Sequence, residues 1–255
     1  MAGSRSALAA LGGCILLLSV PAHAADEEIQ VYMDELNAPG EVGLDVHVND
    51  VLDGDGTPAY PGAESSLHRW RVTPEWSLGL GHGFELGAYL PLTTIAPDGV
   101  FRVDGAKARI KWLAPHQEQG FYWGANLEIG RVSHRVDEDP WNGELKAIAG
   151  WRNERWVLAA NANFDFVISG PVHAPASFQL ATKIGYKVTP RLTLGVESYN
   201  GLGSFDAFGF DHQEHTTFLA ADFSLGKWDF NAGIGEGYGT SADSTIAKAV
   251  ISVPI

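Results

Sequence analysis

Stretches of about ten residues in which apolar and polar side chains alternate recur along most of this sequence. In residues 68–80, the tryptophans and leucines all occupy even-numbered positions, whereas the arginines and the glutamate occupy odd-numbered ones. A β-strand places these two sets on opposite faces, whereas a helix would scatter both around its axis. Pro74 interrupts the pattern and predicts a local irregularity, because proline cannot donate to the strand ladder. The alternation therefore predicts a chain built from strands that have one apolar face.

The same criterion predicts twelve strands, an even number as in single-chain bacterial barrels. They are expected at residues 41–51, 68–80, 84–95, 103–114, 120–132, 141–151, 156–168, 177–188, 192–200, 215–225, 228–235 and 245–255. The connections alternate between short turns, such as 81–83 and 189–191, and long polar loops, such as 52–67 and 201–214. Short turns at one end and long loops at the other are typical of an outer-membrane barrel.

Tryptophans give a second indication of a membrane barrel, because they cluster at the ends of the predicted strands. Six lie on the apolar face close to short turns: Trp76, Trp112, Trp123, Trp151, Trp156 and Trp228. Near the opposite strand ends, the same face carries Trp70, Trp141, Phe166 and Phe178. Two aromatic girdles at the membrane interfaces explain this distribution. The alternative is a soluble β-sandwich or lectin, in which the apolar face is an interior core and strand-end tryptophans have no reason to recur.

The N-terminus has the layout of a secretory signal peptide. Arg5 precedes an apolar run at 7–20, and the small residues Ala22 and Ala24 mark a cleavage site before Ala25. A lipoprotein box ending at Cys14 is the alternative, but the apolar run continues beyond that cysteine, which favours cleavage after Ala24. We therefore predict a signal peptide at 1–24, a periplasmic segment at 25–40 that lies at the barrel end or tucks into its mouth, and a barrel at 41–255.

The predicted mature chain is strongly acidic and contains no cysteine. Residues 25–255 contain 16 basic and 31 acidic side chains, which gives a formal net charge of −15. The missing thiol excludes disulfides and cysteine-based catalysis, and the acidity argues against nucleic acid as a partner. No stretch of this part is apolar over the roughly 18 residues that a spanning helix needs. We expect outer-membrane lipid, lipopolysaccharide and a small solute as partners, with the oligomeric state left open.

Three segments, 72–79, 84–91 and 188–197, are similar to outer-membrane proteins grouped with the phenol meta-degradation pathway, and residues 31–48 extend the resemblance. The matching features are glycines and prolines near turns and alternating aromatic residues. The resemblance implies an all-β, single closed antiparallel transmembrane barrel that transports small, often aromatic, compounds. It implies no catalytic site.

The predicted inward face carries charges of both signs, and two interpretations stay open. The first is a network of cross-strand ion pairs, in which counting from the Pro190 turn places Lys183 opposite Glu197. The second is a selectivity lining, because charged pore walls select solutes by sign. The candidate lining residues are Arg69, Arg71, Glu75, Tyr89, Lys107, Arg109, Tyr122 and Glu128.

Two functions follow from these interpretations. One is a channel or facilitator for small solutes, with anionic or aromatic solutes as the candidates, and the other is a structural or surface-interaction barrel with a closed lumen. An enzyme is not expected, because no nucleophile and base come together in the pattern. No cofactor or metal site is expected either. Residues 53–56 resemble part of a calcium loop, and His212 and His215 flank Glu214, but neither has the full ligand spacing, which favours solvated loops.

Overall fold

The computed structural model describes residues 28–255, so the predicted signal peptide at 1–24 lies outside the described residues. Twelve strands follow one another along the chain. They are β1 (Val42–Gly54), β2 (Trp70–Gly81), β3 (Phe84–Ile95), β4 (Phe101–Leu113), β5 (Gly120–Val132), β6 (Trp141–Arg152), β7 (Trp156–Ser169), β8 (Ser177–Thr189), β9 (Leu192–Ser204), β10 (Glu214–Leu225), β11 (Trp228–Gly239) and β12 (Asp243–Val253). Among the described residues, no helix is long and apolar enough to cross a membrane.

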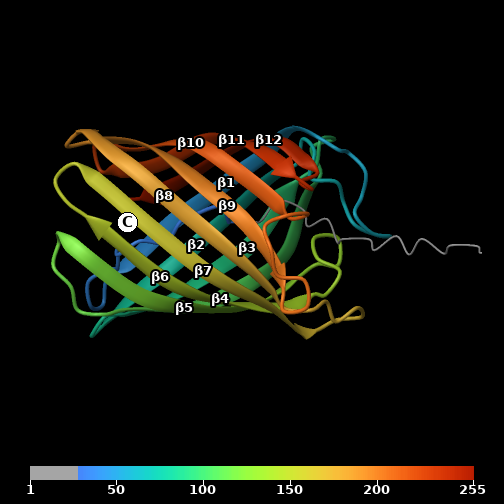
Figure 1. Ribbon diagram of the computed structural model, residues 1–255, viewed down its shortest axis with the longest axis horizontal. Coiled ribbons are helices and arrows are strands. Elements are labelled where there is room, and N and C mark those ends of the chain that lie inside the picture. The colour runs from blue at the N-terminus through green and yellow to red at the C-terminus, as the bar shows by residue number, and fades with distance from the viewer. Residues whose placement is uncertain (1–27) are drawn as a thin grey trace, which may run out of the picture.

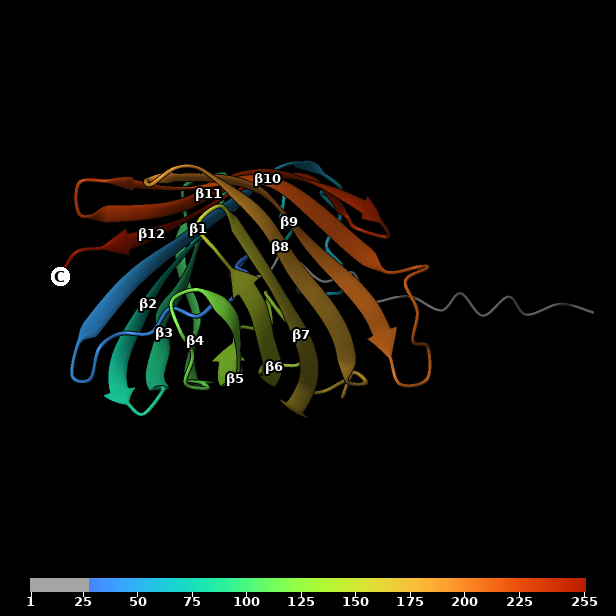
Figure 2. The same ribbon diagram turned by 60° about the vertical axis from the view of Figure 1, so that its left-hand side comes forward.

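Every strand pairs in antiparallel fashion with its sequence neighbours, and β1 pairs with β12 to close the barrel. The predicted closed antiparallel twelve-stranded barrel is therefore confirmed. Closure satisfies the backbone groups that an open sheet edge would expose to lipid. Figures 1 and 2 show the strongly tilted strands, with the C-terminus at one end and the longer connections at the other.

Prolines account for two irregularities in the pairing of β3 with its neighbours. The register between β2 and β3 shifts between Val72 and Glu75, on either side of Pro74. The register between β3 and β4 shifts between Tyr89 and Leu92, next to Pro91. On its other side, Pro74 stays in register with Val46 of β1. The irregularity predicted at Pro74 is therefore confined to the β3 side of β2.

The two faces of each strand are sorted as the alternation predicts. In β2, Trp70, Trp76 and Leu78 are exposed on the outer surface, whereas Arg71 and Glu75 are buried inside the barrel. An apolar outer surface suits hydrocarbon, and an inner surface that carries charges suits a polar interior. This arrangement, together with the closed barrel, places the protein in the outer membrane.

Candidate functional site

The lumen is the candidate site, because every residue proposed as a lining residue points into the barrel. Arg69 lies just before β2, and the others belong to β2, β3, β4 and β5. Only Lys107 among these eight keeps an appreciable exposed fraction, 17% of its side chain. The buried members are Arg69, Arg71, Glu75, Tyr89, Arg109, Tyr122 and Glu128.

Residues 28–40, here called the luminal segment, run through the lumen along its inner wall. At the short-turn end, Gly40 donates a backbone hydrogen bond to Gly79 at 2.8 Å. Farther along, Ile29 packs against Val51, Phe218 and Ile246, close to the long loops. The segment therefore penetrates well beyond the barrel mouth. Its assignment to the periplasmic side of the membrane stays a prediction.

Tyr32 anchors the middle of the luminal segment. Its backbone N–H donates to Oδ1 of Asn161 at 2.6 Å, and its carbonyl accepts from Nδ2 of the same side chain at 2.9 Å. Its hydroxyl contacts the hydroxyl of Tyr89 across the lumen. Asn161 thus satisfies both backbone groups of Tyr32, as a neighbouring strand would, and links the segment to β7.

The ring of Tyr32 lies among cations. The Nζ of Lys146 is 4.0 Å from the ring centroid, and Lys111 and Arg109 lie 5.1 Å and 5.7 Å away. A tyrosine hydroxyl is protonated at neutral pH, so the ring of Tyr32 is a neutral face on which ammonium groups rest.

Gly79 permits the close approach of the luminal segment to β2. A Cβ atom at this position would lie 2.2 Å from the carbonyl oxygen of Ala38 and 2.4 Å from that of Asn37. Both obstacles are backbone atoms, so they cannot move aside as a flexible side chain does. Beside them, the backbone N–H of Asn37 donates a hydrogen bond to the Glu85 carboxylate of the wall at 2.8 Å. A residue other than glycine at position 79 would push the segment off the wall.

The predicted basic residues are engaged by carboxylates. Arg109 contacts Glu75 and Glu85, the latter at 2.9 Å. Arg69 lies 2.6 Å from Glu64, and Lys107 lies 3.3 Å from Glu128. The ion-pair interpretation therefore holds for these residues, and Lys107 is the most accessible cation of the three.

The pairing of Arg109 departs from simple cross-strand neighbours. Glu128 lies directly opposite Arg109 in the register of β4 and β5. The guanidinium nevertheless reaches Glu75 on β2 and Glu85 on β3. A long side chain inside a curved wall can cross one or two strands, so the register alone does not give its partner.

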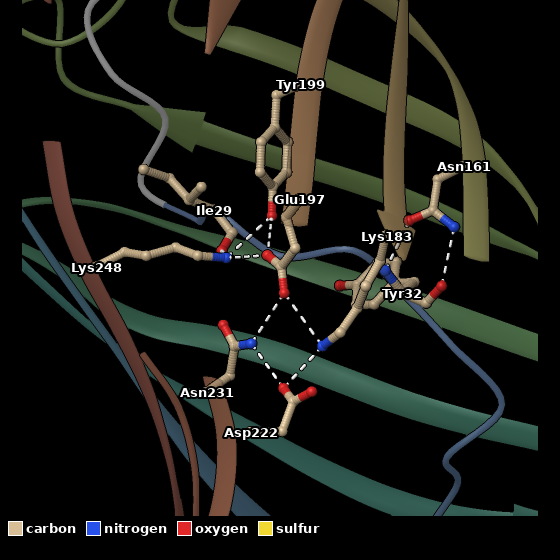
Figure 3. Close-up of polar contacts among 9 residues, drawn as sticks. All are labelled: Ile29, Tyr32, Asn161, Lys183, Glu197, Tyr199, Asp222, Asn231 and Lys248. Atoms are coloured by element: carbon tan, nitrogen blue, oxygen red, sulfur yellow. Dashed lines mark hydrogen bonds and ion pairs between the residues drawn. The ribbon is translucent and has the colours of Figure 1, made fainter. Parts of the chain in front are cut away.

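The opposite wall of the lumen carries a second charged cluster (Figure 3). Lys183 lies opposite Glu197 in the register of β8 and β9, as predicted, and their charged atoms are 3.1 Å apart. Lys248 of β12 contacts the other oxygen of Glu197 and donates to the Ile29 carbonyl at 2.9 Å. Glu197, on β9, thus contacts side chains of both β8 and β12, and through Lys248 it indirectly holds the luminal segment.

Tyr122 lies near the short-turn end of the lumen. It is buried beside Tyr32 and Leu113, and the guanidinium of Arg152 lies 5.9 Å from its ring centroid. Arg152 also contacts Asp34, which accepts from Nε at 2.9 Å. His116 approaches the same carboxylate at 3.2 Å. Asp34, a luminal-segment residue that the sequence pattern did not single out, therefore joins two turns of the barrel.

The loop motifs serve structural roles. Asp55 accepts a hydrogen bond from the backbone N–H of Thr57 at 2.9 Å, which closes a local turn. The ring of His215 is buried, stacks on Phe210 at 3.8 Å, and has Nε2 3.0 Å from the Phe210 carbonyl oxygen. In residues 28–255, one group of three metal-ligating side chains comes together, and it lies in the lumen: Glu28, His47 and Glu75.

The comparisons with known proteins agree with this architecture. Residues 46–253 match the family described as "Putative MetA-pathway of phenol degradation". No curated protein sequence matches the chain. Several solved structures share the fold at low sequence identity, among them two porins and an outer membrane channel. The KdgM porin has a TM-score of 0.56, is 13% identical, and covers 84% of this chain and 99% of its own.

The other two structures are similarly distant in sequence. The COG4313 outer membrane channel from Pseudomonas putida F1 has a TM-score of 0.56 and is 12% identical, with 88% of this chain and 99% of that chain covered. The NanC porin has a TM-score of 0.55 and is 8% identical, with 83% of this chain and 100% of that chain covered. At such identities the likeness speaks for the fold alone.

Proposed function

Because this chain belongs to the family described as "Putative MetA-pathway of phenol degradation", we propose that it is an outer-membrane channel for small solutes. The observation that carries the proposal is the sorting of the wall. Charged and hydrogen-bonding side chains line the interior from the short turns to the long loops, whereas the outside is apolar. A barrel that conducts small solutes requires a polar interior of this kind.

The solute class we propose is small and anionic or aromatic. The luminal segment occupies part of the cross-section, so a passing solute must be narrow. Lys107 offers a cation with an accessible side chain, and Arg69, Arg71 and Arg109 belong to the same wall. Tyr89 and Tyr122 belong to the same interior but are buried against Tyr32, so they would meet a solute only where the luminal segment is displaced. The proposal assigns no reaction and no cofactor to the chain.

Conductance across a planar lipid bilayer tests the proposal. We expect the purified protein to conduct and to favour anions, measured as the reversal potential in a salt gradient. Lys107→Gln removes the accessible cation and should lower the anion preference, whereas Lys227→Gln, in the exposed turn between β10 and β11, should leave it unchanged. Arg109 is a poorer choice, because its loss would leave Glu75 and Glu85 unpaired in the interior.

A closed structural barrel is the second candidate, and the luminal segment favours it. Tyr32 is only 3% exposed and contacts both walls, so the described segment obstructs the centre of the lumen. Absence of both conductance and solute flux into liposomes would reject the channel and leave this alternative. Conductance with cation preference would keep the channel and reject the proposed basic lining.

A further inference from the structure

Three side chains with metal-ligating atoms converge in the lumen from three separate elements. Glu28 belongs to the luminal segment, His47 to β1 and Glu75 to β2. One ligand atom from each lies within 4.8 Å of the other two. The Nε2 of His47 is 2.9 Å from Oε2 of Glu75. Two of these elements, β1 and β2, are paired strands of the barrel wall, and the third is the luminal segment docked against that wall.

Glu28 and His47 each hold a buried polar atom that lacks a hydrogen-bond partner. These atoms are Oε1 of Glu28 and Nδ1 of His47. His47 is 2% exposed, so water does not replace the missing partner freely. A buried carboxylate oxygen or imidazole nitrogen without a partner is costly, and it marks a site that is completed by something else.

The surrounding charges favour a cation. Asp45, Glu28 and Glu75 are the carboxylates that act on His47, and Arg109 is the cation that contacts one of them. With His47 neutral, these carboxylates and Arg109 carry a formal charge of −2, which one divalent ion balances.

We propose that Glu28, His47 and Glu75 bind a divalent transition-metal ion, for which Zn²⁺ is the fitting probe. One imidazole and two carboxylates are a ligand set that Zn²⁺ accepts, and three protein ligands leave a position for water or a solute. Magnesium and calcium prefer oxygen ligands alone, so the histidine selects against them.

The neighbours of Glu75 support this assignment. Oε1 of Glu75 accepts from Arg109, which leaves Oε2 directed at His47. Outer hydrogen bonds of this kind fix the orientation of a metal-ligating carboxylate. On β12, the strand that pairs with β1, Lys248 holds the Ile29 carbonyl and so fixes the residue next to Glu28 (Figure 3). Both ends of the ligand set are therefore positioned by groups that do not themselves bind the ion.

The ion would fasten the luminal segment to β1 and β2, because only Glu28 among the ligands belongs to the segment. Neither the binding site nor this fastening depends on the proposed channel function. Metal binding is measured on the purified protein in detergent micelles, with no transport involved. A failure of metal binding therefore leaves the channel proposal standing, and a failure of conductance leaves the metal site standing.

Equilibrium dialysis with Zn²⁺ followed by elemental analysis tests the site, using tag-free protein first stripped with a chelator. We expect one tightly bound Zn²⁺ per chain and a Kd raised at least about tenfold by Glu28→Gln and by His47→Gln. Glu35→Gln is the matched control, because this carboxylate lies in the same segment but is 63% exposed. It should bind as the native protein does.

The proposal is overturned if native protein binds no Zn²⁺, or if both variants bind it as tightly as the native protein, which would place the ion in the acidic loops. Heat-modifiable migration in gel electrophoresis confirms that each variant is a folded barrel. If His47→Gln does not fold, zinc binding by Glu28→Gln alone tests the proposal. Glu28 lies before the first strand, so its substitution does not change a residue of the barrel wall. Cobalt absorption gives an independent readout: a tetrahedral band with nitrogen ligation is expected, and its persistence in Glu28→Gln would refute the site.

Discussion

Replacing Tyr32 by alanine should release the luminal segment while the barrel stays folded. Tyr32 is 3% exposed, and it packs with Leu113, Tyr122 and Ile148. Truncating a buried aromatic side chain to alanine costs roughly 3–5 kcal/mol. The strands pair with one another without the help of Tyr32, so this cost falls on the docking of the segment.

At the lower limit of about 3 kcal/mol, the population of the undocked segment rises on the order of 100-fold. A single cysteine at position 31 reports the undocked population, because Val31 is 3% exposed when the segment is docked and becomes accessible when it undocks. The rate of maleimide labelling of Val31→Cys in liposomes should increase by a similar factor when Tyr32→Ala is added. The one cysteine of the sequence, Cys14, lies in the predicted signal peptide, so the reporter is the only thiol of the predicted mature chain.

Glu35→Ala in the same background is the control, because its exposed carboxylate lies 3.7 Å from Arg152 and such surface pairs contribute little. A labelling rate that Tyr32→Ala leaves within about threefold of its starting value corresponds to less than about 0.7 kcal/mol. That result would refute the reasoning, since the segment would then be held by contacts other than the buried ring.

Three further predictions follow from particular contacts. Gly79→Ala should also raise the labelling rate of Val31→Cys, because its Cβ meets two backbone oxygens. Gly209→Ala is the control and should leave the rate unchanged, because the space around it is open. Equal labelling rates in the two variants would contradict the close approach of the luminal segment to Gly79. Glu197→Gln should lower the free energy of barrel unfolding by roughly 3–5 kcal/mol in urea titration, since Lys183 and Lys248 lose their shared buried partner; a loss below about 1 kcal/mol would argue against that pairing. For Asp139, burial raises the pKa, but hydrogen bonds from Ala174, Val172 and His173 outweigh it and lower the pKa below its ordinary value. Its carboxylate therefore stabilises the loop 170–176 at neutral pH, and this contribution is lost as the pH falls through that lowered pKa. Hydrogen exchange at neutral pH should show that the loop opens more readily in Asp139→Ala than in the native protein. Equal protection in the two proteins would count against this role of Asp139.

The alternation of apolar and polar residues was sufficient to predict the wall of the barrel. A period of two assigns every side chain to one of two faces, whatever the rest of the chain does. Turn positions then set the register, so the pairing of Lys183 with Glu197 follows from counting outward from Pro190. Closure of the sheet into a barrel is predictable as well, because an open edge in lipid leaves backbone groups unsatisfied.

What fills the barrel was decided only by the tertiary structure. The period assigns Arg109 to the inside, but its partners Glu75 and Glu85 lie 34 and 24 residues away along the chain and do not oppose it in the adjacent register of β5. The path of residues 28–40 has no periodic signal, since the segment makes no regular ladder with any strand. Its contacts come from side chains such as Asn161, 129 residues from Tyr32.

The sequence by itself therefore determined which residues face lipid and which face the lumen, because that choice depends on local strand geometry and on the solvent on each side. Only the folded structure decided that the lumen is occupied by residues 28–40 and that Glu28 meets His47 and Glu75 there. These contacts join elements that are brought together by closure of the barrel. Their energy depends on distances across the lumen, which no local pattern encodes.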